Sequence, residues 1–123
     1  MDDVTSIQQL YALYGHVMDD RDWSRLPELF TEDCVFDATA LGVPLMEGRE
    51  AIARATETSP QTPLAHHVTN VFVEHIDGDR ATVRAKALGS YAQGRMFSGS
   101  YVDSLVRSGE RWRIRRRLNR PTT

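Results

Sequence analysis

The chain has 123 residues, of which 41% are hydrophobic and 26% charged, a balance typical of one globular domain. Its single cysteine, Cys34, excludes an intrachain disulfide and a cysteine-rich zinc site. The net charge of −2 gives no general attraction to nucleic acid, and no apolar run approaches the ~20 residues that a membrane-spanning helix needs. We expect one cytoplasmic domain over residues 1–123, with no nucleic-acid or membrane partner and no secretory signal.

Helical patterns dominate the first half of the chain. Apolar residues recur at helical spacing from Ile7 to Met18, and Thr5 with Gln8 forms a capping-box pattern that predicts a helix start near Thr5. The polar run 19–22 interrupts the apolar stripe. The other elements expected in this half are a short helix, a strand and a third helix, at residues 23–30, 34–39 and 49–55.

Strand patterns follow the breaker cluster at residues 58–63. Apolar and charged residues alternate from Arg80 to Ala87, which is typical of a half-buried strand. The remaining strands are predicted at 64–76, 96–106 and 112–118. Hairpin turns are predicted at 77–79 and 108–110. Helices in the first half and antiparallel strands in the second indicate an α+β fold whose curved sheet surrounds an apolar pocket.

Arginines concentrate near the C-terminus of the chain, between residues 111 and 120. They could mark an anionic partner, but no basic groove with aromatic stacking platforms accompanies them. We therefore interpret them mainly as the solvated outer face of a last strand.

No Gly-rich phosphate loop, paired cysteine set or nucleophile elbow is present. The remaining Tyr, Asp, His and Arg residues suit proton transfer without a cofactor or metal. His66 and His67 are neighbours on a predicted strand, so only one can enter the pocket. The face that His66 shares with Asn70 and Phe72 mixes apolar and polar residues, and the pattern does not decide between His66 and His67. If this face is the inner one, His66 is either a general acid or base or a buried structural group.

Tyr14 lies at the centre of the apolar stripe of the first helix, so its hydroxyl could reach a cavity. Asp19 follows five residues later, about 140° around an ideal helix. The two side chains can share a pocket only if the helix ends or bends near Asp19. Otherwise Asp19 is a surface or helix-end residue.

Two later strands carry further candidates. Tyr101 and Asp103 share a strand face with Phe97, where the carboxylate is either a pocket base or a solvated edge group. In the last strand, Arg116 has the same parity as Ile114, so we expect Arg116 to point inward as an anion stabiliser. By the same parity, Arg115 and Arg117 are expected to point outward.

Several short segments carry a family resemblance through their order and spacing. They are Tyr14-x4-Asp19-x2-Asp22-Trp23, residues 29–37, 47–52, 66–70, 77–81, 99–103 and 111–114. Together they resemble the SnoaL-like branch of the nuclear transport factor 2-like superfamily, which includes polyketide cyclases and relatives of scytalone dehydratase and bile acid dehydratase. The resemblance covers about Thr5 to Leu118.

This resemblance implies a cone-shaped α+β barrel with a deep pocket, and commonly a homodimer that packs through the outer sheet face. By motif position it implies Tyr14, Asp19 and His66 as catalytic residues without a cofactor. The residues expected to bind the substrate are Arg116, Asn70, Tyr101, Asp103 and Phe97. On this basis we expect a lyase or isomerase of dehydratase or cyclase type, acting on a hydrophobic oxygenated ring compound of polyketide or steroid metabolism.

The same superfamily leaves alternatives open, because its fold hosts many functions. One is a non-catalytic pocket for a small molecule or a partner protein. An epoxide hydrolase would need an Asp-Arg-Asp arrangement, for which Arg84 and Arg95 are the candidate arginines, and a steroid isomerase would need Asp37 or Asp103 as base. For the dimer, an outer face exposing Thr69, Val71 and Val73 is expected.

Overall fold

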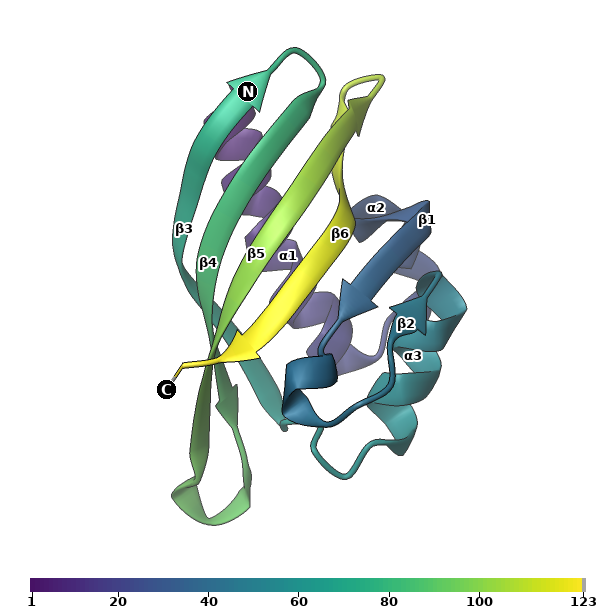
Figure 1. Ribbon diagram of the computed structural model, residues 1–123, viewed down its shortest axis with the longest axis vertical. Helices are drawn as coiled ribbons and strands as arrows, with labels where there is room; N and C mark the ends of the chain where they lie inside the picture. The colour runs from purple at the N-terminus through teal and green to yellow at the C-terminus, as the bar shows by residue number, and fades with distance from the viewer. Residues whose placement is uncertain (123) are drawn as a thin grey trace.

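The computed structural model describes residues 1–122, in which a curved six-stranded sheet packs against one long helix and two short ones (Figure 1). The elements in chain order are α1 (Asp3–Asp20), a 3₁₀ turn (Trp23–Arg25), α2 (Leu26–Leu29), β1 (Phe30–Asp37), a second 3₁₀ turn (Thr39–Leu41), β2 (Met46–Glu47), α3 (Arg49–Thr58), β3 (Ala65–Asp77), β4 (Arg80–Ser90), a third 3₁₀ turn (Ala92–Gly94), β5 (Met96–Ser108) and β6 (Arg111–Pro121).

The strands are ordered β2-β1-β6-β5-β4-β3, and β1 runs parallel to β6 while all other neighbours are antiparallel. The α1 helix lies behind the sheet in Figure 1 and contacts β3 and β6. This arrangement confirms the predicted α+β fold with a mixed, mostly antiparallel sheet. The sheet stays open, so the barrel is incomplete.

The first helix buries the predicted apolar stripe, with Ile7 and Tyr14 almost fully covered. Its N-cap is Asp2, whose carboxylate accepts a hydrogen bond from the Thr5 amide at 2.7 Å, so the predicted start at Thr5 is three residues late. The helix ends at Asp20 because Arg21 adopts a left-handed conformation at φ 53°. Asp19 therefore projects from the last turn of α1.

The second helix is shorter than expected. Only residues 26–29 form an α-helix, and Phe30 begins β1 by pairing with Ile114 of β6. The predicted residues 23–25 form the first 3₁₀ turn instead, and the strand starts four residues before the predicted Cys34.

A bulge in β3 reverses the predicted faces of that strand. Thr69 pairs with Lys86 and Phe72 with Arg84, so Asn70 and Val71 together oppose the single residue between those partners. Asn70 adopts φ 52°, and both Asn70 and Phe72 are exposed while Val71 packs against the core. The expectations that Asn70 and Phe72 face the pocket, and that Val71 and Val73 are exposed, are wrong for this reason; Val73 also packs on the core.

A second bulge, in β6, reverses the expected roles of the C-terminal arginines. Ser104 pairs with Arg116 and Leu105 with Ile114, which leaves Arg115 as the extra residue. Arg117 is consequently fully buried, whereas Arg116 points outward and lies 3.7 Å from the Asp37 carboxylate. The prediction of an inward Arg116 and an outward Arg117 is therefore wrong.

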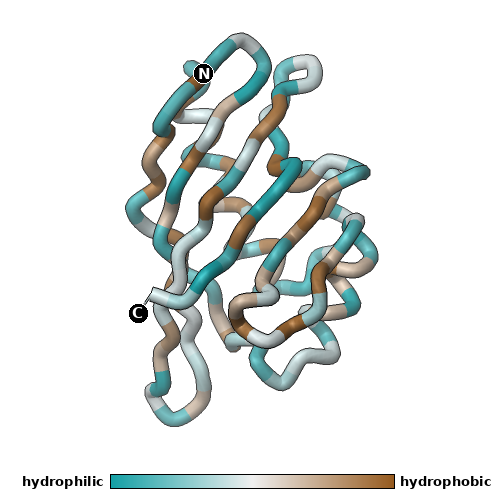
Figure 2. Tube along the Cα trace, viewed as in Figure 1, coloured by the Kyte–Doolittle hydropathy of each residue, from teal (hydrophilic) through white to brown (hydrophobic). Residues whose placement is uncertain are grey.

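Figure 2 shows apolar and hydrophilic residues alternating along the strands of the sheet, as expected where one face is covered by helices. The covered face holds the buried Val83, Tyr101, Leu105 and Ile114. Within residues 1–122, no helix combines the length and hydropathy required to cross a bilayer.

Candidate active site

A pocket of about 1120 Å³ opens between the covered face of the sheet, α1, α3 and the loops that flank α3. Its buried lining includes Tyr14, Ile52 and Tyr101, while Met96 and Phe97 are exposed and stand at its rim. Most of the lining is apolar, with a few polar groups, which is typical of sites for small organic ligands.

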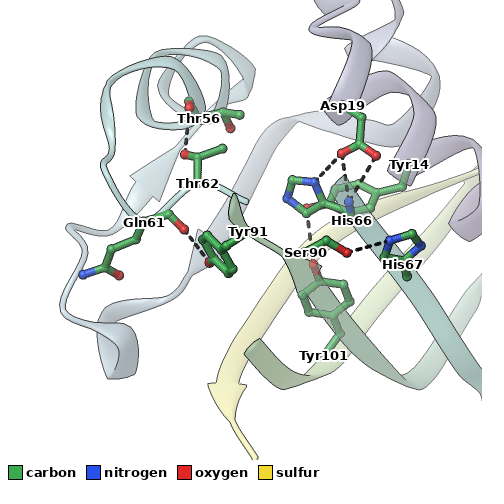
Figure 3. A network of polar contacts seen from close by, with 10 residues as sticks. All are labelled: Tyr14, Asp19, Thr56, Gln61, Thr62, His66, His67, Ser90, Tyr91 and Tyr101. Carbon is green, nitrogen blue, oxygen red and sulfur yellow. Dashed lines mark hydrogen bonds and ion pairs between the residues drawn. The ribbon is translucent and has the colours of Figure 1, made fainter. Parts of the chain in front are cut away.

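A histidine–carboxylate pair lies at this pocket. The Nδ1 atom of His66 is 2.7 Å from Oδ1 of Asp19, and the His66 amide donates to both carboxylate oxygens, at 2.9 and 3.1 Å (Figure 3). His66 lines the pocket, and the two side chains are only 14% and 24% exposed. The expected contact between His66 and Asp19 is present, although Asp19 supports the pocket wall from behind instead of lining it.

The pair forms because α1 approaches β3 closely at Gly15, one turn before Asp19. A Cβ atom at Gly15 would lie 2.9 Å from the carbonyl oxygen of His66, so only glycine permits this packing without a shift. An interior helical glycine costs about 1 kcal/mol relative to alanine, and that unfavourable residue is the sequence signal that could have indicated a close approach.

Two tyrosines extend the site into the core. The Tyr14 ring packs edge-on against the His66 ring with centroids 5.9 Å apart, and makes a similar contact with Tyr101. The Tyr101 hydroxyl donates to the Tyr14 hydroxyl over a long 3.4 Å, which leaves the proton of Tyr14 available for a ligand in the pocket.

A fully buried ion pair, which sequence reasoning did not predict, lies against the rings of these two tyrosines. Arg117 donates from Nε and Nη2 to Asp103 at 2.8 to 3.2 Å, and Tyr11 donates its hydroxyl to the same carboxylate. The guanidinium carbon lies 3.7 Å from the ring centroid of Tyr101 and 4.4 Å from that of Tyr14. We call these residues, Tyr11, Asp103 and Arg117, the buried triad.

Burial and charge govern the ionisation of this region. Burial disfavours the charged guanidinium, but the Asp103 carboxylate outweighs that cost and raises the pKa of Arg117 well above its ordinary value. Burial, followed by the negative charge of Asp103, raises the pKa of Tyr11, and burial with the neighbouring Tyr14 raises that of Tyr101. The arginine is therefore charged and both phenols neutral near neutral pH.

The predicted substrate-binding residues separate into three groups. Tyr101 and Phe97 line the pocket. Asp103 is buried in the triad and does not line it. Asn70 and Arg116 lie on the outer face, so neither can contact a ligand in the pocket.

The other candidates lie elsewhere. His67 is exposed and contacts the Ser90 hydroxyl, which makes His66 the histidine of the inner face. Arg84 pairs with Glu74, and Asp37 accepts hydrogen bonds from Thr39, so neither joins a site. Arg95 stands at the pocket rim with its guanidinium over Tyr91. No Asp-Arg-Asp arrangement forms around Arg84 or Arg95 within residues 1–122.

Asn119 is a further pocket residue that the sequence did not single out. Its side-chain oxygen is buried without a hydrogen-bond partner in the described chain. The β6 bulge also explains this placement, because Asn119 shares its inward parity with Arg117. In the part of the chain that the structure describes, no three His, Cys, Asp or Glu residues are grouped as metal ligands.

An open curved sheet over a long first helix, with a pocket at one end, defines the nuclear transport factor 2-like class of α+β folds. Residues 1–118 match the SnoaL-like domain, and the chain belongs to that family. An uncharacterised protein of Mycobacterium tuberculosis is 31% identical over 124 residues, covering 94% of this chain and 83% of the relative.

Solved structures agree with this assignment. A candidate scytalone dehydratase from Novosphingobium aromaticivorans superposes with a TM-score of 0.79 and 25% identity, covering 98% of this chain and 85% of the other. A nuclear transport factor 2-like protein with a cystatin-like fold, from the same organism, gives a TM-score of 0.82 at 26% identity, covering 97% and 81%.

Proposed function

We propose that this protein is a cofactor-independent lyase or isomerase that uses His66 as a general base and acid. The observation that carries the proposal is the 2.7 Å contact between His66 Nδ1 and Asp19 at the wall of a large apolar pocket. A carboxylate accepts hydrogen bonds only, so Nδ1 carries the proton and Nε2 is the basic nitrogen available to a ligand. Asp19 then stabilises the imidazolium that forms after proton transfer.

Tyr14 completes the proposed chemistry. When His66 removes a proton from carbon next to a carbonyl group, the C–H electron pair moves toward the carbonyl oxygen. Tyr14 donates a hydrogen bond to that developing oxyanion. In an elimination, the imidazolium returns the proton to a departing hydroxyl group, which leaves as water; in an isomerisation, it returns the proton to another carbon.

The proposed substrate is a hydrophobic, oxygenated ring compound. Aromatic and aliphatic lining residues such as Phe36, Ile52 and Phe97 suit the ring, while Tyr14 and His66 contribute adjacent polar groups to the lining. The similar structure described as a candidate scytalone dehydratase supports a dehydratase-type reaction. A non-catalytic binding pocket is the rival that the experiment below distinguishes.

A substrate-independent test uses 5-nitrobenzisoxazole, an apolar aromatic whose ring opens to a coloured phenolate when a base removes its C–H proton. The wild-type protein is expected to accelerate the opening, and His66→Ala to lower kcat/KM by at least ~10²-fold. Asp19→Asn is expected to lower it less, because the imidazole remains. Nitrogen NMR of the His66 ring should report the Nδ1–H tautomer, and Asp19→Asn should shift it.

His67→Ala is the matched control, since His67 is exposed and faces away from the pocket. It should open the ring at the wild-type rate. Equal rates for the wild type and His66→Ala would overturn the catalytic proposal. If the pocket then still bound neutral aromatics, the non-catalytic rival would stand.

We also propose a homodimer through the outer face of the sheet. On that face Phe72 is 56% exposed, and the half-buried Val102 and Leu118 lie on β5 and β6 in the same row as Arg84. Exposed apolar side chains grouped on the outer face of a sheet favour a partner. Sedimentation of the wild type as a monomer at micromolar concentration would contradict this assembly.

A further inference from the structure

Charges on the pocket lining have one sign. Arg54 and Arg95 both line the pocket, and within residues 1–122 no Asp or Glu does. The chain as a whole has a net charge of −2, so this asymmetry does not follow from composition. Many other arginines are paired, as Arg84 is with Glu74, but neither Arg54 nor Arg95 forms an ion pair with any described residue.

The two arginines stand at the rim and approach it from different elements. Arg54 projects from α3 and Arg95 from the turn between β4 and β5, and both are exposed, whereas Tyr14 and Tyr101 are buried at the inner end. The Arg95 guanidinium carbon lies 5.1 Å from the centroid of the Tyr91 ring.

Tyr91 in turn fixes this rim. Its hydroxyl donates to the Gln61 carbonyl at 2.7 Å, and the Leu64 amide donates to the Ser90 carbonyl at 2.7 Å (Figure 3 shows the first contact). The strand-connecting turn and the loop after α3 are thereby joined beside the pocket. Arg95 is thus held on an ordered rim rather than on a free loop.

We propose that the substrate is an anionic amphiphile whose apolar ring reaches Tyr14 and His66, while a carboxylate or phosphate group stays at the mouth with Arg54 and Arg95. This inference rests on the proposed function, since it takes the same pocket as the substrate site. Guanidinium groups match the oxygen geometry of both anions, and rim charges of one sign concentrate and orient ligands of the opposite sign.

Two fluorescent probes with one aromatic framework test the inference. 8-Anilinonaphthalene-1-sulfonate carries an anionic group, and N-phenyl-1-naphthylamine lacks it. The wild type is expected to bind the sulfonate more tightly than the neutral probe. Arg54→Gln and Arg95→Gln should each weaken sulfonate binding by at least about threefold, without a comparable loss for the neutral probe, and added salt should have the same effect.

Arg80→Gln is the matched control, because it removes the same charge from an exposed position at the far end of β4. It should bind both probes as the wild type does. Arg95→Lys keeps the charge while changing the stacking on Tyr91, and should retain most of the preference for the sulfonate. Displacement of the sulfonate by 1-naphthoate or by 1-naphthyl phosphate then identifies the preferred anion.

Each result is decisive. Equal affinity for the two probes would overturn the inference of an anionic substrate, as would a loss of sulfonate affinity in Arg80→Gln as large as that in Arg54→Gln. Either result would leave the proposed pocket function intact. Failure of both probes to bind would overturn the pocket function together with this inference.

Discussion

The protein contains two carboxylate–cation pairs that differ in almost every physical respect. Asp19 and His66 are partly exposed and meet at the pocket, and the imidazole can both accept and donate a proton. Asp103 and Arg117 are both fully buried, and the arginine keeps its charge. The first pair is therefore suited to move a proton, and the second is suited to hold Tyr14 and Tyr101 in place without titrating.

The comparison also explains why the two carboxylates are not interchangeable candidates for catalysis. Asp103 already accepts three hydrogen bonds from the Arg117 guanidinium and one from Tyr11, so its lone pairs are occupied within the core. Asp19 accepts hydrogen bonds from the imidazole and the backbone amide of one residue, His66. A carboxylate can stabilise an imidazolium only if it is hydrogen-bonded to the imidazole that gains the proton. Of the two carboxylates, Asp19 contacts a histidine and Asp103 does not.

The largest expected effect is on stability and concerns the buried pair. Arg117→Met removes the cationic partner of the buried Asp103, so we expect the free energy of unfolding to fall by about 3 to 5 kcal/mol, measured by urea denaturation. The double variant Arg117→Met/Asp103→Leu should recover part of that loss. Arg116→Met is the control, since its pair with Asp37 lies at the surface and should contribute less than about 1 kcal/mol. Equal losses of unfolding free energy in Arg117→Met and Arg116→Met would contradict the greater structural role of the buried pair.

The next effect is a loss of stability in alkali, which also belongs to the buried region. The pKa values of Tyr11 and Tyr101 are raised above the ordinary 10.0, so the unfolded chain releases these protons first. The stabilising contribution of the two protonated phenols is complete below the ordinary pKa of 10.0. It is lost as the pH rises above that value, at about 1.4 kcal/mol per pH unit for each group. Tyr101→Phe should reduce this slope by one group's share in denaturation series at increasing pH. An unchanged slope would contradict the assignment.

The smallest effect concerns the first pair and the glycine that permits it. Gly15→Ala forces α1 away from β3, at a cost of about 1 to 3 kcal/mol for overpacking. The better helix propensity of alanine offsets about 1 kcal/mol of that cost. The net loss of stability should therefore be modest, but the Asp19–His66 contact should lengthen and the NMR signal of His66 Nδ1 should shift. Gln9→Ala, on the exposed side of the same helix, should leave that signal unchanged.

Several features of this protein followed from its sequence alone. The apolar stripe from Ile7 to Met18 and the alternation in residues 80–87 were enough to predict the first helix and the α+β class, because these patterns are periodic and local. The candidates Tyr14, Asp19 and His66 came from family-like spacing, and their catalytic roles stay a prediction.

Only the tertiary structure decided which side chains face inward on β3 and β6. β3 has a bulge at Asn70 and a further irregularity between Val73 and His75, and β6 has a bulge at Arg115. The bulges at Asn70 and Arg115 each reverse the parity that a simple alternation predicts. Nothing local marks these positions, because a bulge is defined by the register of the neighbouring strand. The burial of Arg117, and the contact between Asp19 and a histidine 47 residues away, arise in the same way from packing between distant segments.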